Sequence, residues 1–206
     1  MQKKSTIHHD TTARHLRKYS NRNPIHQFTL GRFFNKVADE VQRIQPENTL
    51  EFGCGEGLFL EQLKKRNVFF PHLTGIDLRK DSIVYAQDLH PEYSFQCIDL
   101  FDFKPKHDFD LVIASQVLEH LIDPEPFLGR LVSLSKSYLL LTVPWEPWFQ
   151  LMNLLRGRDV LRLGNHPEHV NQWTVRGFKK FVSQHAELLR VTAVFPFIII
   201  LAEVPT

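Results

Sequence analysis

The sequence has few cysteines, little net charge and no long apolar run, and each shortage excludes a class of protein. Two cysteines, Cys54 and Cys97, are too few for a disulfide framework, so we expect free thiols in a reducing compartment. A formal net charge of +2 gives no electrostatic argument for nucleic acid or a membrane surface as partner. The longest apolar run, residues 195–202, is far shorter than the roughly 20 residues that span a bilayer.

Targeting signals and internal repeats are also lacking. Residues 1–10 have no apolar core of the kind that a secretory signal contains, so we expect a cytoplasmic protein. A length of 206 residues, with 43% hydrophobic and 23% charged residues, predicts one soluble globular domain spanning residues 1–206. These features leave the oligomeric state open.

What the sequence does contain is an alternation of short apolar runs with segments of helical periodicity. The expected strands are 49–52, 73–76, 93–98, 109–114 and 138–143. The expected helices between them are 58–65, 82–89 and a segment from Pro124 to about residue 133, with Asp123 as N-cap. This order predicts an α/β protein whose parallel sheet has helices on both faces.

The segments at the two ends of the chain differ from this alternation. Apolar residues recur at helical spacing between residues 25 and 44, before the first strand. Near the other end, Thr174 caps a predicted helix, and two strands, 188–195 and 197–204, meet at Pro196. Two strands joined so tightly form an antiparallel hairpin, so we expect seven strands in a mostly parallel sheet.

A glycine-rich turn lies between the first strand and the next helix. Gly53, Gly55 and Gly57 allow a tight turn and a close backbone approach to a ligand. Glu51 stands two residues before Gly53, where its carboxylate would repel a pyrophosphate. A glycine turn with this carboxylate beside it suits a ligand that has an ammonium group and a nearby sulfonium, as in S-adenosylmethionine.

Two further acids follow the next strands. Asp77 can accept the hydroxyls of a ribose, and Asp99 can accept an adenine amino group. Leu78 and Leu100, directly after these acids, offer apolar surface to the ring. Each acid alone also fits a solvated strand end, but three beside one glycine turn predict a ligand site at the carboxyl edge of the sheet.

Residues 49–143 resemble the core of the class I S-adenosylmethionine-dependent methyltransferases. Residues 51–57 are similar to the family's first motif, Asp77 to its ribose acid and Asp99 to its adenine-site acid. Residues 109–120 resemble the fourth-strand motif, with the Glu-His ending of the small-molecule branch. The resemblance implies a three-layer Rossmann-like sandwich with S-adenosylmethionine as cofactor, and it adds Gln116 to the cofactor residues.

The acceptor site is less clearly indicated. Transfer to a hydroxyl oxygen requires a base, and His120 and His169 are the candidates, although either fits a purely structural role. We expect a small-molecule acceptor, with the aromatic and polar insertion 145–173 forming part of its site. The resemblance implies that the N-terminal helical region, residues 1–46, forms a lid.

Other functions remain open. Small-RNA 2′-O-methyltransferases carry a Glu-x-x-Glu-His motif, and Glu119, His120 and His169 would hold their divalent ion. Gln116 replaces the first glutamate here, so we expect no metal and no RNA substrate. A cofactor-binding module without catalysis is another possibility, whereas Glu51 and the terminal hairpin disfavour a nicotinamide dehydrogenase.

Overall fold

The computed structural model describes residues 23–146 and 170–205. Along the chain, its helices and strands are α2 (Pro24–Ile44), β1 (Asn48–Phe52), α3 (Leu58–Lys64), β2 (His72–Asp77), α4 (Lys80–Leu89), β3 (Ser94–Cys97), β4 (Phe109–Ser115), the short 3-10 helix η1 (Leu118–His120), α5 (Pro124–Leu134), β5 (Ser135–Pro144), α7 (Val175–Val182), β6 (Glu187–Val194) and β7 (Phe197–Glu203).

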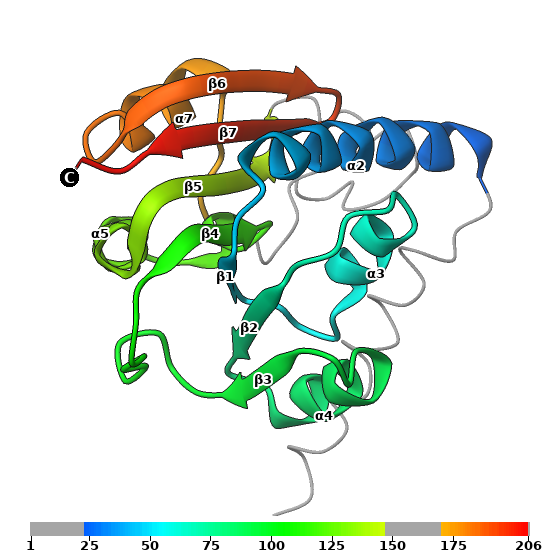
Figure 1. The fold of residues 1–206 in the computed structure, drawn as a ribbon. Coiled ribbons are helices and arrows are strands. Elements are labelled where there is room, and N and C mark those ends of the chain that lie inside the picture. Colours follow the sequence, from blue (N-terminus) through cyan, green and yellow to red (C-terminus); the bar gives the residue numbers. More distant parts are fainter. Residues whose placement is uncertain (1–22, 147–169, 206) are drawn as a thin grey trace, which may run out of the picture.

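The seven strands form one sheet in the order β3-β2-β1-β4-β5-β7-β6 (Figure 1). Neighbouring strands from β3 to β5 are parallel, whereas β7 is antiparallel to both of its neighbours. The predicted α/β fold, its seven-stranded sheet and its antiparallel terminal hairpin are therefore confirmed.

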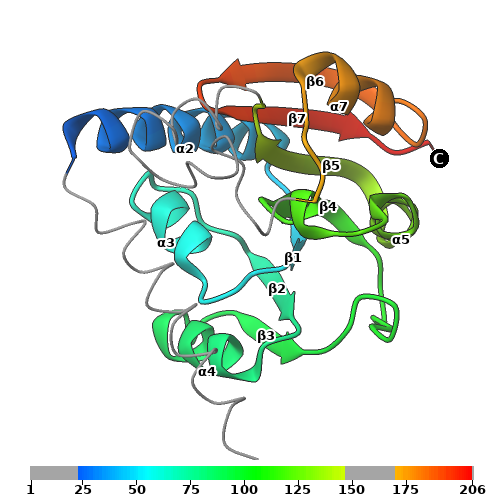
Figure 2. The ribbon, with the colours of Figure 1, turned by 180° about the vertical axis from the view of Figure 1, so that it is seen from behind.

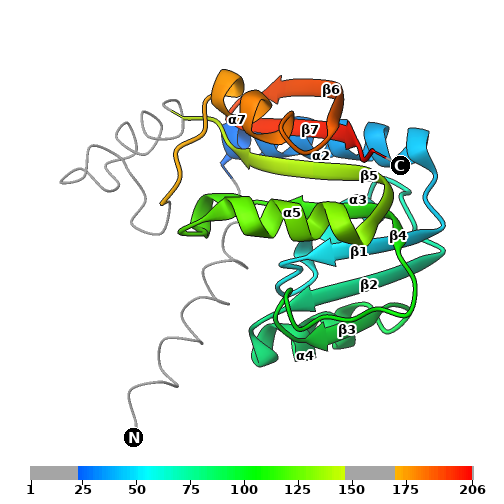
Figure 3. The ribbon, with the colours of Figure 1, turned by 90° about the vertical axis from the view of Figure 1, so that its left-hand side faces the viewer.

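Helices cover both faces of the sheet (Figure 3). Strand β4 shows how the sequence achieves this, because Leu111 and Ile113 face one core while Val112 and Ala114 face the other. The first core contains residues of α2, α3 and α4, and the second contains residues of α5 and α7. Strands buried on both faces explain the continuous apolar runs of the sequence.

Two helix starts agree with the capping residues predicted from the sequence. The Asp123 side chain accepts a hydrogen bond from the backbone N–H of Glu125, at 3.3 Å. The Thr174 hydroxyl accepts one from the N–H of Gly177, at 3.0 Å. A short polar side chain at each start satisfies an N–H group that has no partner within the helix.

The described part of the N-terminal region is α2, and it belongs to the core. Its Leu30, Phe33, Phe34 and Val37 are buried, and the helix contacts α3, β6 and β7. The lid expected of residues 1–46 stays a prediction, since residues 1–22 lie outside the described residues. Within the described ranges, no helix is both long and apolar enough to cross a membrane.

Candidate functional site

The predicted cofactor residues meet at one edge of the sheet. Phe52 at the end of β1 pairs with Ile76 of β2 on one side and with Ala114 of β4 on the other. The residues that follow these three strand ends therefore lie together at the carboxyl edge, where ligands of open α/β sheets bind. Figure 3 shows β1, β2 and β3 pointing towards this edge.

The glycine turn has the backbone geometry that its sequence predicts. Gly53, Gly55 and Gly57 have φ angles of 69°, 52° and 72°, a region that residues with side chains rarely adopt. A Cβ atom on Gly53 would lie 2.6 Å from a methyl carbon of Val117. The turn is bonded to the neighbouring strand, because the N–H groups of Gly53 and Cys54 both donate to the Ile76 carbonyl.

Glu51 is a buried carboxylate at this turn. It is 2% exposed, and its Oε2 has no hydrogen-bond partner among the residues that the structure describes. Burial, followed by the negative charge of Asp77, raises the pKa of Glu51 from 4.5 to about 8. A buried acid without a donor is costly, and an ammonium group from a ligand would satisfy it.

Asp77 ends β2 and is fixed by two backbone N–H groups. Its Oδ2 accepts from Gly55 and its Oδ1 from Arg79, each at 2.9 Å. The Arg79 side chain lies close by, with Nε 3.6 Å from Asp77 Oδ1. These contacts hold the carboxylate in one orientation beside the turn, as recognition of a ribose would require.

The predicted adenine side contains two different kinds of apolar residue. Leu78 and Phe101 are 67% and 47% exposed, so both offer surface to a flat ring. Leu100 is instead buried in the core, and only its backbone remains for a ligand. Asp99 lies two residues beyond β3, where its Oδ1 accepts from the Phe101 N–H.

Gln116 follows β4 directly and lies at the same edge. Its φ angle is 58°, and its side chain donates to the Thr142 hydroxyl at 3.3 Å. The Ser115 hydroxyl shares that partner at 2.9 Å. The position of Gln116 is therefore set by a short polar chain that links β4 to β5.

Of the two histidines predicted as candidate general bases, His120 and His169, only His120 lies among the described residues. It ends η1, and its side chain is 40% exposed, with Nε2 3.9 Å from a carboxylate oxygen of the buried Glu119. A base must reach solvent-facing space to meet an acceptor, and this ring does. His169 lies outside the described residues.

The insertion 145–173 is anchored at both of its described ends. At the far end, the N–H groups of Val170 and Asn171 both donate to the Glu119 carbonyl. The Asn171 side chain donates to the carbonyls of Leu118 and Leu121. At the near end, the Glu146 N–H donates to the Trp173 carbonyl at 2.8 Å. The insertion therefore returns to the turn that carries His120.

Several residues at the turn were not predicted from the sequence. Glu56 is buried, and its Oε1 accepts from Arg79 at 3.2 Å and from the Ser82 hydroxyl at 3.0 Å. His90 is fully buried, with Nε2 2.9 Å from the Gly57 carbonyl. The opposite charges of Glu56, after β1, and Arg79, after β2, could have indicated their ion pair. Nothing in the sequence indicates the contact of His90.

Both cysteines are free thiols, as predicted. Cys54 lies within the turn, and burial raises the pKa of its thiol far above the usual range, so the thiol is unreactive. Within the described ranges, no group of three His, Cys, Asp or Glu side chains is arranged to hold a metal ion. The absence of metal stays a prediction, because His166 and His169 are not among these residues.

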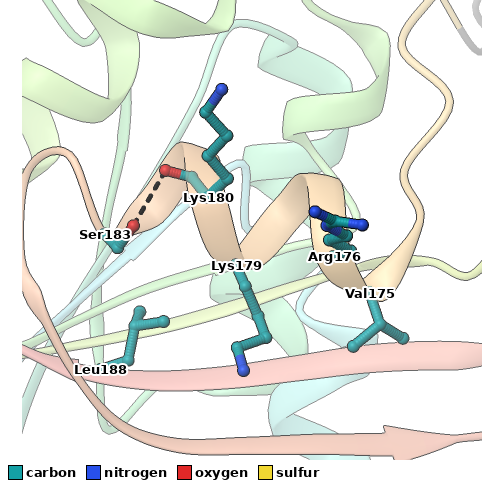
Figure 4. Close-up of a pocket in the computed structure, with 6 residues that line it drawn as sticks. All are labelled: Val175, Arg176, Lys179, Lys180, Ser183 and Leu188. Carbon is teal, nitrogen blue, oxygen red and sulfur yellow. Dashed lines mark hydrogen bonds between the residues drawn. The ribbon is translucent and has the colours of Figure 1, made fainter.

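A groove of about 560 Å³ lies away from the glycine turn, on α7 and the start of β6 (Figure 4). Its lining consists of Val175, Arg176, Lys179, Lys180, Ser183 and Leu188. The Ser183 hydroxyl donates to the Lys180 carbonyl, so its proton is already engaged. The groove concentrates positive charge, in contrast to the acidic cofactor edge.

Comparisons with known proteins agree with this geometry. The chain is 28% identical over 161 residues to a ubiquinone biosynthesis O-methyltransferase of Rhodopseudomonas palustris, covering 74% of this chain and 59% of that protein. It thus spans less than two thirds of that relative's length.

Solved structures share the fold at low identity. Magnesium protoporphyrin IX methyltransferase from Synechocystis, with bound S-adenosylhomocysteine, superposes with a TM-score of 0.72 at 18% identity and 95% coverage of each chain. The cyclase SpnF has the same fold, with a TM-score of 0.64 at 14% identity, covering 85% of this chain and 82% of its own. The fold by itself therefore does not define the reaction.

A family described as "Methyltransferase domain" matches residues 26–186. That range runs from α2 to the residue before β6 and includes the glycine turn, Asp77, Asp99 and the Glu-His pair. The match covers far more than half of the chain, and the fold has the sheet order and terminal hairpin expected from the motifs. The chain belongs to the methyltransferase-domain family.

Proposed function

We propose that this chain transfers a methyl group from S-adenosylmethionine to a hydroxyl oxygen of a small molecule. One observation carries the cofactor assignment: Glu51 is buried at the glycine turn with Oε2 lacking a partner, beside the fixed carboxylate of Asp77. Two acids at a turn of three glycines suit a ligand that has an ammonium group, a sulfonium and a ribose.

Each described residue has a distinct task in this proposal. Glu51 accepts from the ammonium group, Asp77 accepts from the ribose hydroxyls, and Asp99 accepts from the adenine amino group. Leu78 and Phe101 cover the ring, while the backbone of Leu100 and the side chain of Gln116 complete the site. When bound, the cofactor supplies an electrophilic methyl group on sulfur.

The chain's own contribution to the chemistry is positioning and proton removal. A bond forms between the acceptor oxygen and the methyl carbon as the carbon–sulfur bond breaks, and S-adenosylhomocysteine leaves. The acceptor's proton passes to the imidazole of His120 or His169. The insertion 145–173 supports this arrangement, because Asn171 ties its end to the turn that carries His120.

The relative's name supports oxygen as the methylated atom, since that protein is called an O-methyltransferase. A phenol or catechol is then a reasonable first acceptor, because its hydroxyl proton is acidic enough for histidine to remove. The RNA alternative has no comparable support, and the acceptor of this chain is proposed to be a small molecule. We also propose that the chain acts in the cytoplasm.

Calorimetry and mass spectrometry test the proposal directly. Titration with S-adenosylhomocysteine should show one site, and titration with NAD should show none. Incubation with S-adenosylmethionine and a panel of catechols should then give methylated products and S-adenosylhomocysteine. Binding without turnover on any acceptor would instead favour the non-catalytic module, and activity lost with a chelator and restored by a divalent ion would favour the RNA-type mechanism.

A further inference from the structure

Helix α4 contacts the glycine turn at two separate points. From its start, the Ser82 hydroxyl donates to Glu56 Oε1, and Arg79, directly before the helix, donates to the same oxygen. From its end, the ring of His90 reaches the carbonyl of Gly57. Figures 1 and 2 show α4 next to β3. Helices α3 and α4 contribute to the same hydrophobic core, so both lie on one face of the sheet.

The hydrogen bond of His90 has only one possible direction. A carbonyl only accepts, so His90 Nε2 carries the proton and donates to Gly57 at 2.9 Å. Nδ1 makes no hydrogen bond within the described residues and lies 3.9 Å from a carboxylate oxygen of Glu92. The ring is fully buried. The Gly57 carbonyl also accepts the first hydrogen bond of α3, from the Glu61 N–H at 3.1 Å, so His90 supplies the second of two hydrogen bonds to this buried oxygen.

The ring also fits closely against the turn. A Cβ atom on Gly57 would lie 2.9 Å from His90 Cδ2 and 3.4 Å from the Cβ of Ala86, another residue of α4. Gly57 is the N-cap of α3 and has no side chain with which to cap the helix. The neighbouring helix therefore supplies a steric limit and one hydrogen bond to this glycine, in addition to its bonds with Cys54 and Glu61.

We propose that α4 positions the cofactor turn, and that His90 is a positioning residue for cofactor binding although its ring is buried behind the turn. The inference rests on the proposed cofactor site. Glu56 and Gly57 are adjacent in the chain, and each is held by a different end of one helix. A change at the start of α4 then reaches the turn through the bonds to Glu56, and a change at its end reaches the turn through the bond of His90.

The test compares two substitutions of His90 by S-adenosylhomocysteine titration. His90→Phe keeps a ring but removes the donor, and affinity should fall about tenfold. His90→Gln keeps an N–H near the position of Nε2, and affinity should stay within about threefold of the wild type. Ile83→Val, buried in α4 without a hydrogen bond to the turn, serves as control and should bind as the wild type does.

A second readout separates positioning from general stability. Amide hydrogen exchange at Gly55 and Gly57 in the free protein should speed up in His90→Phe but not in Ile83→Val. If His90→Phe does not fold, Ser82→Ala tests the other contact, with an expected loss of about threefold in affinity.

The outcomes distinguish this inference from the proposed site. Wild-type affinity in both His90→Phe and Ser82→Ala overturns the inference, as does an equal loss in Ile83→Val. A loss in His90→Gln as large as in His90→Phe overturns the role of the hydrogen bond. A wild-type protein that does not bind S-adenosylhomocysteine contradicts the cofactor site itself.

Discussion

The cofactor side and the acceptor side of the same sheet edge are held by different interactions. On the cofactor side, charged groups bond to one another and to the turn, with the buried Glu56 and the half-buried Arg79 and Asp77 in one network. On the acceptor side, the insertion returns to η1 mainly through backbone groups and Asn171. A ligand of fixed chemistry needs a fixed turn, whereas a backbone anchor lets the residues between its ends vary with the acceptor.

The largest effect on binding is expected when the buried carboxylate on the cofactor side is removed. Glu51→Gln should weaken S-adenosylhomocysteine binding by roughly 100-fold or more, because removing one partner of a buried ion pair costs about 3–5 kcal/mol. Calorimetry measures the change. Glu61→Gln, an acid on the outer side of α3 that pairs with Lys65, is the control and should bind normally. Normal binding by Glu51→Gln would place the ammonium group elsewhere.

On the acceptor side, the corresponding change is His120→Ala. Cofactor affinity should remain, while turnover with an accepted catechol should fall by roughly 100-fold, the contribution of a general base. Steady-state rates across pH measure this, with the exposed His107→Ala as control. If His120→Ala retains the wild-type rate at every pH, the base is His169 or the acceptor needs none.

A smaller effect is expected at Asp77. Asp77→Ala removes the acceptor of the ribose hydroxyls and also releases the Gly55 N–H. Charge-assisted hydrogen bonds contribute about 1.5–3 kcal/mol each, so affinity should fall at least about tenfold. Asp88→Ala, an exposed acid on α4, provides the reference. An unchanged affinity in a folded Asp77→Ala protein would rule out this ribose site.

The raised pKa of Glu51 predicts that cofactor binding depends on pH. In the free protein Glu51 stays protonated up to about pH 8, so binding an ammonium group at neutral pH should release a proton. S-adenosylhomocysteine affinity should therefore increase by well over tenfold from about pH 6 to 8, because one proton is released per ligand bound. Calorimetry in buffers of different ionisation enthalpy counts the proton, and Glu51→Gln should release none.

The same pKa affects the stability of the free protein, with a defined sign. The unfolded chain ionises Glu51 near pH 4.5, while the folded chain retains the proton to about pH 8. The stabilisation from this group is therefore complete below pH 4.5 and is lost as the pH rises towards 8. Denaturant unfolding of the wild type against Glu51→Gln should show a difference that grows with pH over this window, and a constant difference would contradict it.

The smallest predicted effect concerns the positively charged groove of α7, which lies away from both the cofactor side and the acceptor side. Arg176 and Lys180 are four residues apart on α7, a spacing at which like charges repel. Arg176→Glu replaces this repulsion by an attractive pair with Lys180 and places an acid in the first turn of α7. It should raise the free energy of unfolding by about 0.2–0.5 kcal/mol or more and leave cofactor affinity unchanged. Thermal unfolding and calorimetry measure both. A loss of affinity would mean that the groove is coupled to the cofactor site.

The fold was predictable because its signals are local. Apolar runs, glycine positions and the capping residues Asp123 and Thr174 each belong to a few neighbouring residues, and the structure agrees with them. Strand boundaries were less accurate: β5 begins at Ser135 rather than at Tyr138, because pairing with β4 extends it. Tertiary pairing decides such ends, and propensity does not contain that information.

The site was only partly predictable for the same reason. Glu51 and Asp77 follow from their places at strand ends, and the structure brings both to the turn. Leu100 shows the limit, because its side chain packs into the core while the exposed Phe101 beside it faces solvent. His90 lies 33 residues from Gly57 along the chain, and no local pattern indicates that contact.

The place of β7 has a consequence for how the protein is made. This strand follows β5 and β6 along the chain, yet it lies between them in the sheet, and its residues from Phe197 to Ala202 are all buried. During synthesis, β5 and β6 emerge from the ribosome before the strand that joins them. The nascent chain therefore exposes their apolar faces and unpaired backbone edges until β7 follows, which makes this half of the sheet a natural client for chaperones.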